Sequence, residues 1–180
     1  MAYIIEYIKA IYGEDAIKTD AFYDLGSGIG RGVVAAAFLY PFKKCVGIEF
    51  LGKLHSIALE IKSKYEKKSD EIASSLLSLQ NDNAGKVIPA IELYNDDFLK
   101  HSWRDATFIL ANSTCFSADL MAALSKKAEE ELPPGALFIT FTKRLSNLGE
   151  NWDVRDGFRR LMSWGIATIY IHKKKDDTLL

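Results

Sequence analysis

A run of alternating glycines, Asp24-Leu25-Gly26-Ser27-Gly28-Ile29-Gly30, is the segment of this sequence best suited to hold a small ligand. The apolar residues 21–25 before it are typical of a buried strand, and Val33–Tyr40 after it of a helix. Glycine permits a tight turn and lets a ligand approach the backbone. In open parallel α/β sheets, ligands bind at the carboxyl ends of the strands. We therefore predict a small-molecule site at this turn.

The spacing of the glycines favours S-adenosylmethionine over a dinucleotide. The dinucleotide fingerprint has a third glycine three residues after the second, and Arg31 stands at that position. A dinucleotide also brings a pyrophosphate to the helix N-terminus. S-adenosylmethionine has no phosphate, and Asp24 suits its positively charged amine. A glycine turn alone is a weak signal, so a nicotinamide-dependent oxidoreductase stays open as a minor alternative.

Acidic residues follow at the ends of the next two predicted strands. Glu49 ends the strand 44–49 and can accept hydrogen bonds from both ribose hydroxyls of the cofactor. Asp97 follows the strand 87–94 and can accept from the adenine amino group, while Phe98 can stack on the ring. The alternatives are a solvent-facing strand end for Glu49, an ordinary strand end for Asp97 and a core position for Phe98.

The fourth predicted strand, 107–111, ends in Asn112-Ser113-Thr114-Cys115-Phe116. This place faces the transferred methyl group in such a fold. The Asn112 amide can orient an incoming nitrogen nucleophile, and Phe116 can line a narrow entry. The alternative is that Asn112 or Ser117 caps the helix that begins at Ala118. Cys115 is not expected to be a nucleophile, because no partner histidine is evident.

Strands and helices alternate through the first 140 residues, which predicts an α/β fold. We expect a Rossmann-like class I methyltransferase with a mostly parallel central sheet, helices on both faces and an antiparallel C-terminal edge hairpin. The predicted helices are 1–13, 33–40, 51–79 and 118–131. The predicted strands are 21–25, 44–49, 87–94, 107–111, 135–142, 158–164 and 166–172, with a turn at 81–85.

Composition is that of one globular domain, 1–180, with 48% hydrophobic residues and a net charge of −1. The longest apolar run is too short to span a bilayer, and Met1–Glu6 lacks the flanks of a signal peptide. We expect an intracellular protein, with nucleus or cytoplasm undecided.

The remaining chemistry-bearing residues give weaker indications. Cys45 and Cys115 are expected to be reduced thiols in or near the core. The scattered histidines predict no metal site. The lysine clusters 62–68, 126–127 and 173–175 are interpreted as solvated faces, so evidence for direct nucleic-acid binding is weak.

These motifs together resemble the histone-lysine methyltransferases of the disruptor-of-telomeric-silencing type, called Dot-one-like here. The glycine turn and Val46-Gly47-Ile48-Glu49 are similar to the family's first two motifs. The segments Asp97-Phe98-Leu99 with Trp103, Phe108–Phe116 and Ser163–His172 are similar to later ones. The resemblance extends from about Tyr3 to Lys173.

The resemblance implies which residues contact S-adenosylmethionine, and the turn residues Ser27, Gly28 and Gly30 join them from the motif itself. The implied contacts are Asp24, Gly26, Arg31, Glu49, Phe50, Asp97, Phe98 and Asn112. Asn112 and Phe116 are expected at the reacting centre. Arg31 and Phe50 replace a glutamine and usually a lysine in the family.

The chain also departs from the family. The pattern Asn-Asn-Phe-Ala-Phe is here Asn112-Ser113-Thr114-Cys115-Phe116, which changes the wall of the expected lysine channel. The family's N-terminal helical region and lid loop are not expected in this chain, and Tyr12-Gly13-Glu14 is interpreted as a helix end rather than a lid. The basic segments that contribute to nucleosome contact in the family are also missing from the sequence.

Three functions stay open from the sequence, beside the minor alternative of a nicotinamide-dependent oxidoreductase. The preferred one is a protein-lysine N-methyltransferase with a histone-like substrate, acting by direct displacement at the sulfonium methyl. The second is a methyltransferase on RNA, another protein or a small molecule. The third is a cofactor-binding module without activity. The oligomeric state and the number of methyl groups added are undetermined.

Overall fold

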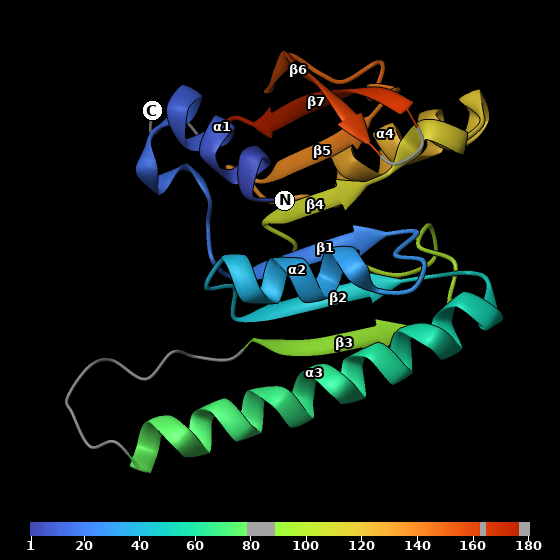
Figure 1. Cartoon of the computed structure of the whole chain (residues 1–180). Helices are drawn as coiled ribbons and strands as arrows, with labels where there is room; N and C mark the ends of the chain where they lie inside the picture. The colour runs from blue at the N-terminus through green and yellow to red at the C-terminus, as the bar shows by residue number, and fades with distance from the viewer. Residues whose placement is uncertain (79–88, 163–164, 177–180) are drawn as a thin grey trace.

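The computed structural model of the chain describes residues 1–78, 89–162 and 165–176. In these ranges the strands form one seven-stranded sheet in the order β3-β2-β1-β4-β5-β7-β6 (Figure 1). The first five strands pair in parallel, and β7 pairs antiparallel with both β5 and β6. The strands are β1 (Ala21–Leu25), β2 (Lys44–Ile48), β3 (Ala90–Tyr94), β4 (Phe108–Ala111), β5 (Leu137–Phe141), β6 (Trp152–Met162) and β7 (Gly165–Lys174).

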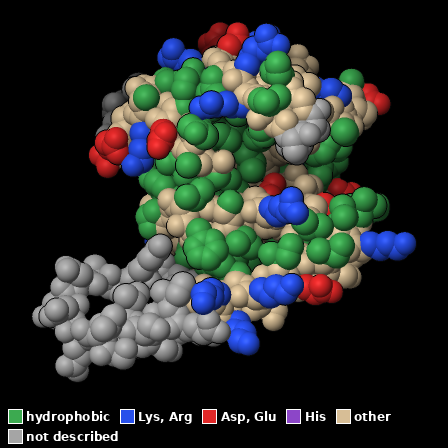
Figure 2. Space-filling model, in the orientation of Figure 1, with side chains coloured by type: hydrophobic (Ala, Val, Ile, Leu, Met, Phe, Trp, Pro, Cys, Tyr) green, Lys and Arg blue, Asp and Glu red, His purple; other side chains and the backbone are tan. Residues whose placement is uncertain are grey.

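Helices cover both faces of the sheet, as Figure 1 shows. One core holds α1 (Ala2–Tyr12), α2 (Arg31–Leu39) and Tyr65 of α3 (Gly52–Ser78) against one face. The other core holds α4 (Ala118–Glu131) against the opposite face. Every residue of β1, β4 and β5 is buried, as expected for parallel strands covered on both sides. Figure 2 shows hydrophobic side chains gathered between α1 and α2 across the middle of the first face.

Local sequence signals set the ends of the helices. Gly13, with φ 95°, ends α1, and its N–H donates to the carbonyl of Lys9 at 2.9 Å. The Ser117 hydroxyl accepts from the N–H of Leu120 at 3.1 Å and so caps the start of α4. Short 3-10 turns follow α1 (η1, Glu14–Ala16) and β4 (η2, Ser113–Cys115). The interpretation of Tyr12-Gly13-Glu14 as a helix end is confirmed.

The predicted order of elements and the antiparallel closing hairpin are confirmed, but some boundaries were wrong. The strand predicted at 158–164 begins earlier, at Trp152. The prediction missed its first residues because several of them are charged, as is common on an exposed sheet edge. The helix predicted from Val33 begins at Arg31, where Gly32 weakens the helical signal. The predicted turn 81–85 lies outside the described residues.

The prediction that both cysteines lie in or near the core was wrong for one of them. Both thiols are free, and Cys45 is buried in β2, but Cys115 is exposed because it ends the surface turn η2. Among residues 1–78, 89–162 and 165–176, no helix is long and apolar enough to cross a membrane. The same ranges contain no group of three His, Cys, Asp or Glu side chains arranged to hold a metal ion.

Candidate active site

Four of the predicted site residues lie at one edge of the sheet because the strands that carry them are parallel neighbours. Asp24 is the fourth residue of β1, and Glu49 directly follows β2. Asp97 lies three residues beyond β3, and Asn112 directly follows β4. The order β3-β2-β1-β4 therefore presents all four at the carboxyl edge, with the glycine turn after β1 at the centre.

The glycine turn is anchored to the end of β2 by backbone hydrogen bonds from Gly26 and Ser27 to the carbonyl of Ile48 and by the carboxylate of Glu49. Gly26, Gly28 and Gly30 have φ values of 75°, 56° and 79°, which side-chain-bearing residues rarely adopt. Glu49, only 7% exposed, accepts from the Gly28 N–H with Oε2 at 2.8 Å and from the Leu51 N–H with Oε1 at 2.8 Å. Each oxygen keeps a further lone pair for a ligand hydroxyl.

Asp24 is a buried carboxylate beside a second acid. It is 6% exposed, and burial raises its pKa to about 7, with the negative charge of Glu49 adding to the shift. No charge or hydrogen bond among the described residues offsets these two effects. A Cβ on Gly32 would collide with Oδ2 of Asp24, so the carboxylate lies directly against the start of α2. The position therefore suits a ligand cation, which fits the amine of S-adenosylmethionine.

The segment after β3 is tied to the end of β2. The Asn95 amide donates to the carbonyl oxygens of Glu49 at 2.8 Å and Phe50 at 3.0 Å. Asp97 Oδ1 accepts from the N–H of Leu99 at 2.9 Å, which leaves Oδ2 for a ligand donor. Phe98 is 8% exposed, and its carbonyl accepts from the indole N–H of Trp103 at 2.9 Å.

Phe116 joins the segments after β3 and β4. Its ring stacks on Phe98 with centroids 5.8 Å apart and an interplanar angle of 29°. Its Cζ atom lies 3.6 Å from the place where a Cβ on Gly26 would stand. The two rings thus form an aromatic wall beside the glycine turn.

Asn112 is exposed at the end of β4, and its side chain is not the cap of α4, since Ser117 has that role. The Oδ1 atom of Asn112 accepts from the Thr114 hydroxyl at 2.9 Å. The structure does not bring every predicted residue into this cluster. Arg31 is exposed at the first position of α2, and Phe50 is 71% exposed after β2.

Sequence reasoning missed several residues that shape the site. Gly32 makes room for Asp24, and Gly47 makes room for Ser27 Oγ, which a Cβ at Gly47 would meet at 2.9 Å. The Asn95 amide had a usable signal, since asparagine directly after a strand favours a turn with side-chain hydrogen bonds. Thr142, which contacts Thr114, had none, because it stands between a buried strand and a charged loop.

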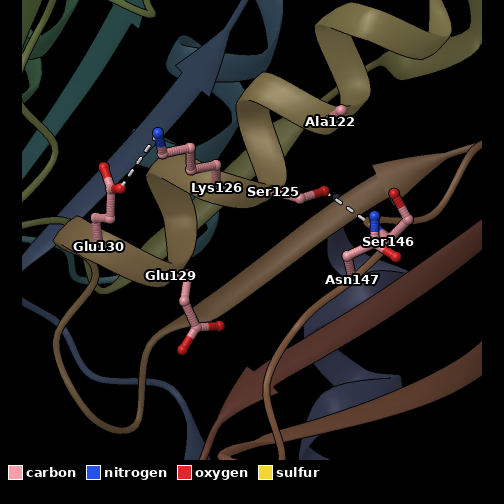
Figure 3. A pocket seen from close by; sticks show the side chains of 7 residues that line it. All are labelled: Ala122, Ser125, Lys126, Glu129, Glu130, Ser146 and Asn147. Atoms are coloured by element: carbon pink, nitrogen blue, oxygen red, sulfur yellow. Dashed lines mark hydrogen bonds and ion pairs between the residues drawn. The ribbon is translucent and has the colours of Figure 1, made fainter.

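A separate cavity of about 280 Å³ lies between α4 and the loop after β5 (Figure 3). It is lined by Ala122, Ser125, Lys126, Glu129, Glu130, Ser146 and Asn147. The Ser125 hydroxyl accepts from the N–H of Ser146 at 3.0 Å and holds the loop against the helix. None of these residues stands at the carboxyl end of β1 to β4, so the cavity is not the predicted site.

The strand order and the ligand-facing strand ends define the Rossmann-like fold of class I S-adenosylmethionine-dependent methyltransferases. An RNA methyltransferase from Salinibacter ruber, in complex with S-adenosyl-L-homocysteine, matches at TM-score 0.64 and 18% identity over 99% of this chain and 94% of its own. A putative methyltransferase from Escherichia coli matches at TM-score 0.62 and 12% identity over 97% and 87%. At these identities the likeness concerns the fold.

The chain belongs to the family described as histone methylation protein DOT1, whose sequence model matches residues 4–157. A Caenorhabditis elegans protein described as "Histone-lysine N-methyltransferase, H3 lysine-79 specific" is 31% identical over 131 residues. That match covers 70% of this chain and 12% of the relative, so the chain corresponds to a small part of that protein. The expected membership in the Dot-one-like family and the expected cofactor, S-adenosylmethionine, are confirmed.

Proposed function

We propose that this domain transfers a methyl group from S-adenosylmethionine to the side-chain amine of a lysine in a histone-like protein. The observation that carries the proposal is the family match over residues 4–157. The relative with H3 lysine-79 specificity supports the choice of acceptor. A histone acceptor would place the protein in the nucleus.

The cofactor would be held by the strand ends. Asp24 would accept from its ammonium group, Glu49 from its ribose hydroxyls and Asp97 from its adenine amine. Phe98 would line the adenine ring. The backbone of Gly26, Ser27, Gly28 and Gly30 would pass close to the cofactor, with Arg31 and Phe50 at the outer rim. The bound cofactor supplies an electrophilic methyl group on a sulfonium.

The acceptor would approach from the end of β4. Asn112 would align its nitrogen with the methyl group, and the Phe116 ring would narrow the approach and exclude water. The lysine must arrive as a neutral amine, and solvent can take its proton. The protein forms no covalent bond to the substrate, so its contribution is alignment.

The first experiment is calorimetric titration with S-adenosylhomocysteine, S-adenosylmethionine and NAD. We expect micromolar binding of the first two, lost in Glu49→Ala and retained in Glu66→Ala, which removes an exposed acid on α3. Preferential binding of NAD would refute the cofactor assignment, and so would unchanged affinity in Glu49→Ala.

The second experiment measures transfer of labelled methyl groups to nucleosomes, free histones and RNA. Lysine methylation of histone H3 would support the proposed acceptor. Labelling of RNA, another protein or a small molecule alone would replace it. Cofactor binding without turnover on any acceptor would indicate a binding module. We further expect Asn112→Ala to slow transfer more than it weakens cofactor binding, and equal loss of both would refute that role.

A further inference from the structure

The segments that follow β4 and β5 are joined by a set of polar contacts that the cofactor site does not use. The fully buried Ser113 hydroxyl lies 2.7 Å from the carbonyl oxygen of Phe141 and 3.0 Å from that of Lys143. The Lys143 ammonium donates back to the carbonyl of Phe116. These contacts fix η2, and therefore the residues on either side of it, against the end of β5.

Thr142 lies at the centre of this junction in an unusual conformation. Its φ of 67° is rare for a β-branched residue. The N–H of Lys143 donates to the carbonyl of Phe141 at 2.7 Å, which closes a three-residue turn around Thr142. The N–H of Thr142 donates to the carbonyl of Thr168 in β7 at 2.7 Å. A strained backbone held by its neighbours is typical of functional sites.

The strained turn brings the Thr142 hydroxyl into a directed chain of hydrogen bonds that ends on Asn112. Thr142 Oγ1 lies 3.0 Å from Thr114 Oγ1, and Thr114 Oγ1 donates to Asn112 Oδ1 at 2.9 Å. Because a hydroxyl has one hydrogen, Thr114 can donate to Asn112 only if it accepts from Thr142. The chain therefore runs from Thr142 through Thr114 to the Asn112 carboxamide.

We propose that Thr114 and Thr142 are positioning residues for methyl transfer, because they hold the Asn112 carboxamide in one orientation. One lone pair of Oδ1 is committed to Thr114, so the second lone pair and the amide N–H groups face fixed directions. Asn112 is exposed, and an exposed asparagine without such a partner would sample several rotamers. The inference rests on the proposed role of Asn112 in aligning the acceptor.

The orientation itself can be measured without any substrate. Side-chain three-bond couplings of Asn112 and NOEs of its amide protons, measured by NMR, should report one χ1, χ2 rotamer in the wild-type chain and in Thr114→Ser, which keeps the hydroxyl. Thr114→Val keeps the shape but removes the hydroxyl, and it should give averaged couplings. A single rotamer retained in Thr114→Val would overturn the proposal, whether or not the chain methylates the expected acceptor.

Kinetics then connect the orientation to transfer, on whichever acceptor the wild-type chain methylates. Thr114→Val should lower kcat roughly 10- to 100-fold, because small misplacements of an aligning group have effects of this size. The affinity for S-adenosylhomocysteine should stay within about twofold, and Thr114→Ser should restore kcat. In the Asn112→Ala background, Thr114→Val should have no further effect on kcat. An additive loss in the double variant would overturn the proposal, whereas absence of transfer by the wild type would refute only the proposed function.

Discussion

Replacing Asp24 by asparagine should stabilise the cofactor-free domain while it abolishes tight cofactor binding. The pKa of Asp24 is raised from 3.8 to about 7 by burial and by the charge of Glu49. At about 1.4 kcal/mol for each tenfold change, this shift corresponds to about 4 kcal/mol of stability. Asparagine has the same shape but does not ionise, so it avoids that penalty.

The sign of the effect depends on pH. Between pH 3.8 and about 7 the folded chain keeps the Asp24 proton and the unfolded chain loses it. Stability therefore falls as pH rises through this window, and the full loss is present above it. The free energy of unfolding of Asp24→Asn should match that of the wild type near pH 4 and exceed it by up to about 4 kcal/mol at pH 8. In a chain of this size the gain corresponds to roughly 8–16 °C in Tm.

The assay is urea unfolding at pH 5 and pH 8, with and without S-adenosylhomocysteine. At a hundredfold excess over Kd the ligand should stabilise the wild type by about 2.7 kcal/mol and leave Asp24→Asn nearly unchanged. Asp15→Asn removes an exposed acid in η1 and is the matched control. It should match the wild type in stability at both pH values and in its stabilisation by the ligand. A stability difference that is the same at both pH values would refute the reasoning, because it could not come from ionisation of Asp24.

Three further changes test the structure around the site. Gly32→Ala should displace the Asp24 carboxylate, because the added Cβ collides with Oδ2. Calorimetry should then show cofactor affinity reduced at least tenfold, and unchanged affinity would contradict the close approach of the two residues. Thr140→Val should raise the free energy of unfolding by about 1 kcal/mol in a urea titration, because the buried Thr140 hydroxyl has no hydrogen-bond partner among the residues that the structure describes. A loss of stability would show that it has one. His172→Gln should flatten the acid side of the stability profile. Burial lowers the pKa of His172 to about 4, so the free energy of unfolding of the wild type falls by up to about 3 kcal/mol as pH falls from 6.5 to 4. Urea unfolding across that range should show no such fall in His172→Gln.

The His172 and Asp24 effects have opposite signs in overlapping pH ranges. His172 makes the wild type less stable as pH falls, and Asp24 makes it less stable as pH rises. Their contributions partly cancel in the wild-type profile. The two single variants should therefore show slopes of opposite sign relative to the wild type, which a general change in packing could not produce.

The central sheet was predictable because its strands are continuous apolar runs that end in marked residues. The glycine turn followed by a helix placed β1, and the acidic residues Glu49 and Asp97 marked the ends of the next two strands. Prolines and glycines marked the ends of the helices, as at Gly13 and Pro41. These signals depend only on residues close together in the chain, so they can be recognised in a single sequence.

The edge of the sheet was harder to predict because its residues respond to partners distant in sequence. Three of the first five residues of β6, Trp152–Asp156, are charged, and the pairing of this segment with β7 decides that it is a strand. The conformation of Thr142 depends on contacts with Thr168 and Thr114, and the neighbouring residue types do not predict a positive φ. The clash that fixes Gly32 is likewise visible only once Asp24 is placed.

Two energetically unfavourable features lie at the carboxyl edge of the parallel strands, which is also the edge that carries the predicted site residues. Asp24 is held in a place where its charge is disfavoured, and Thr142 is held at a φ disfavoured for its side chain. Neither feature stabilises the fold, and both lie at the carboxyl ends of parallel strands, Asp24 on β1 and Thr142 directly after β5. The fully buried strands β1, β4 and β5 supply the stability that tolerates them. A ligand cation beside Asp24 would stabilise its negative charge and gain affinity from it. The strained conformation of Thr142 would serve to align Asn112.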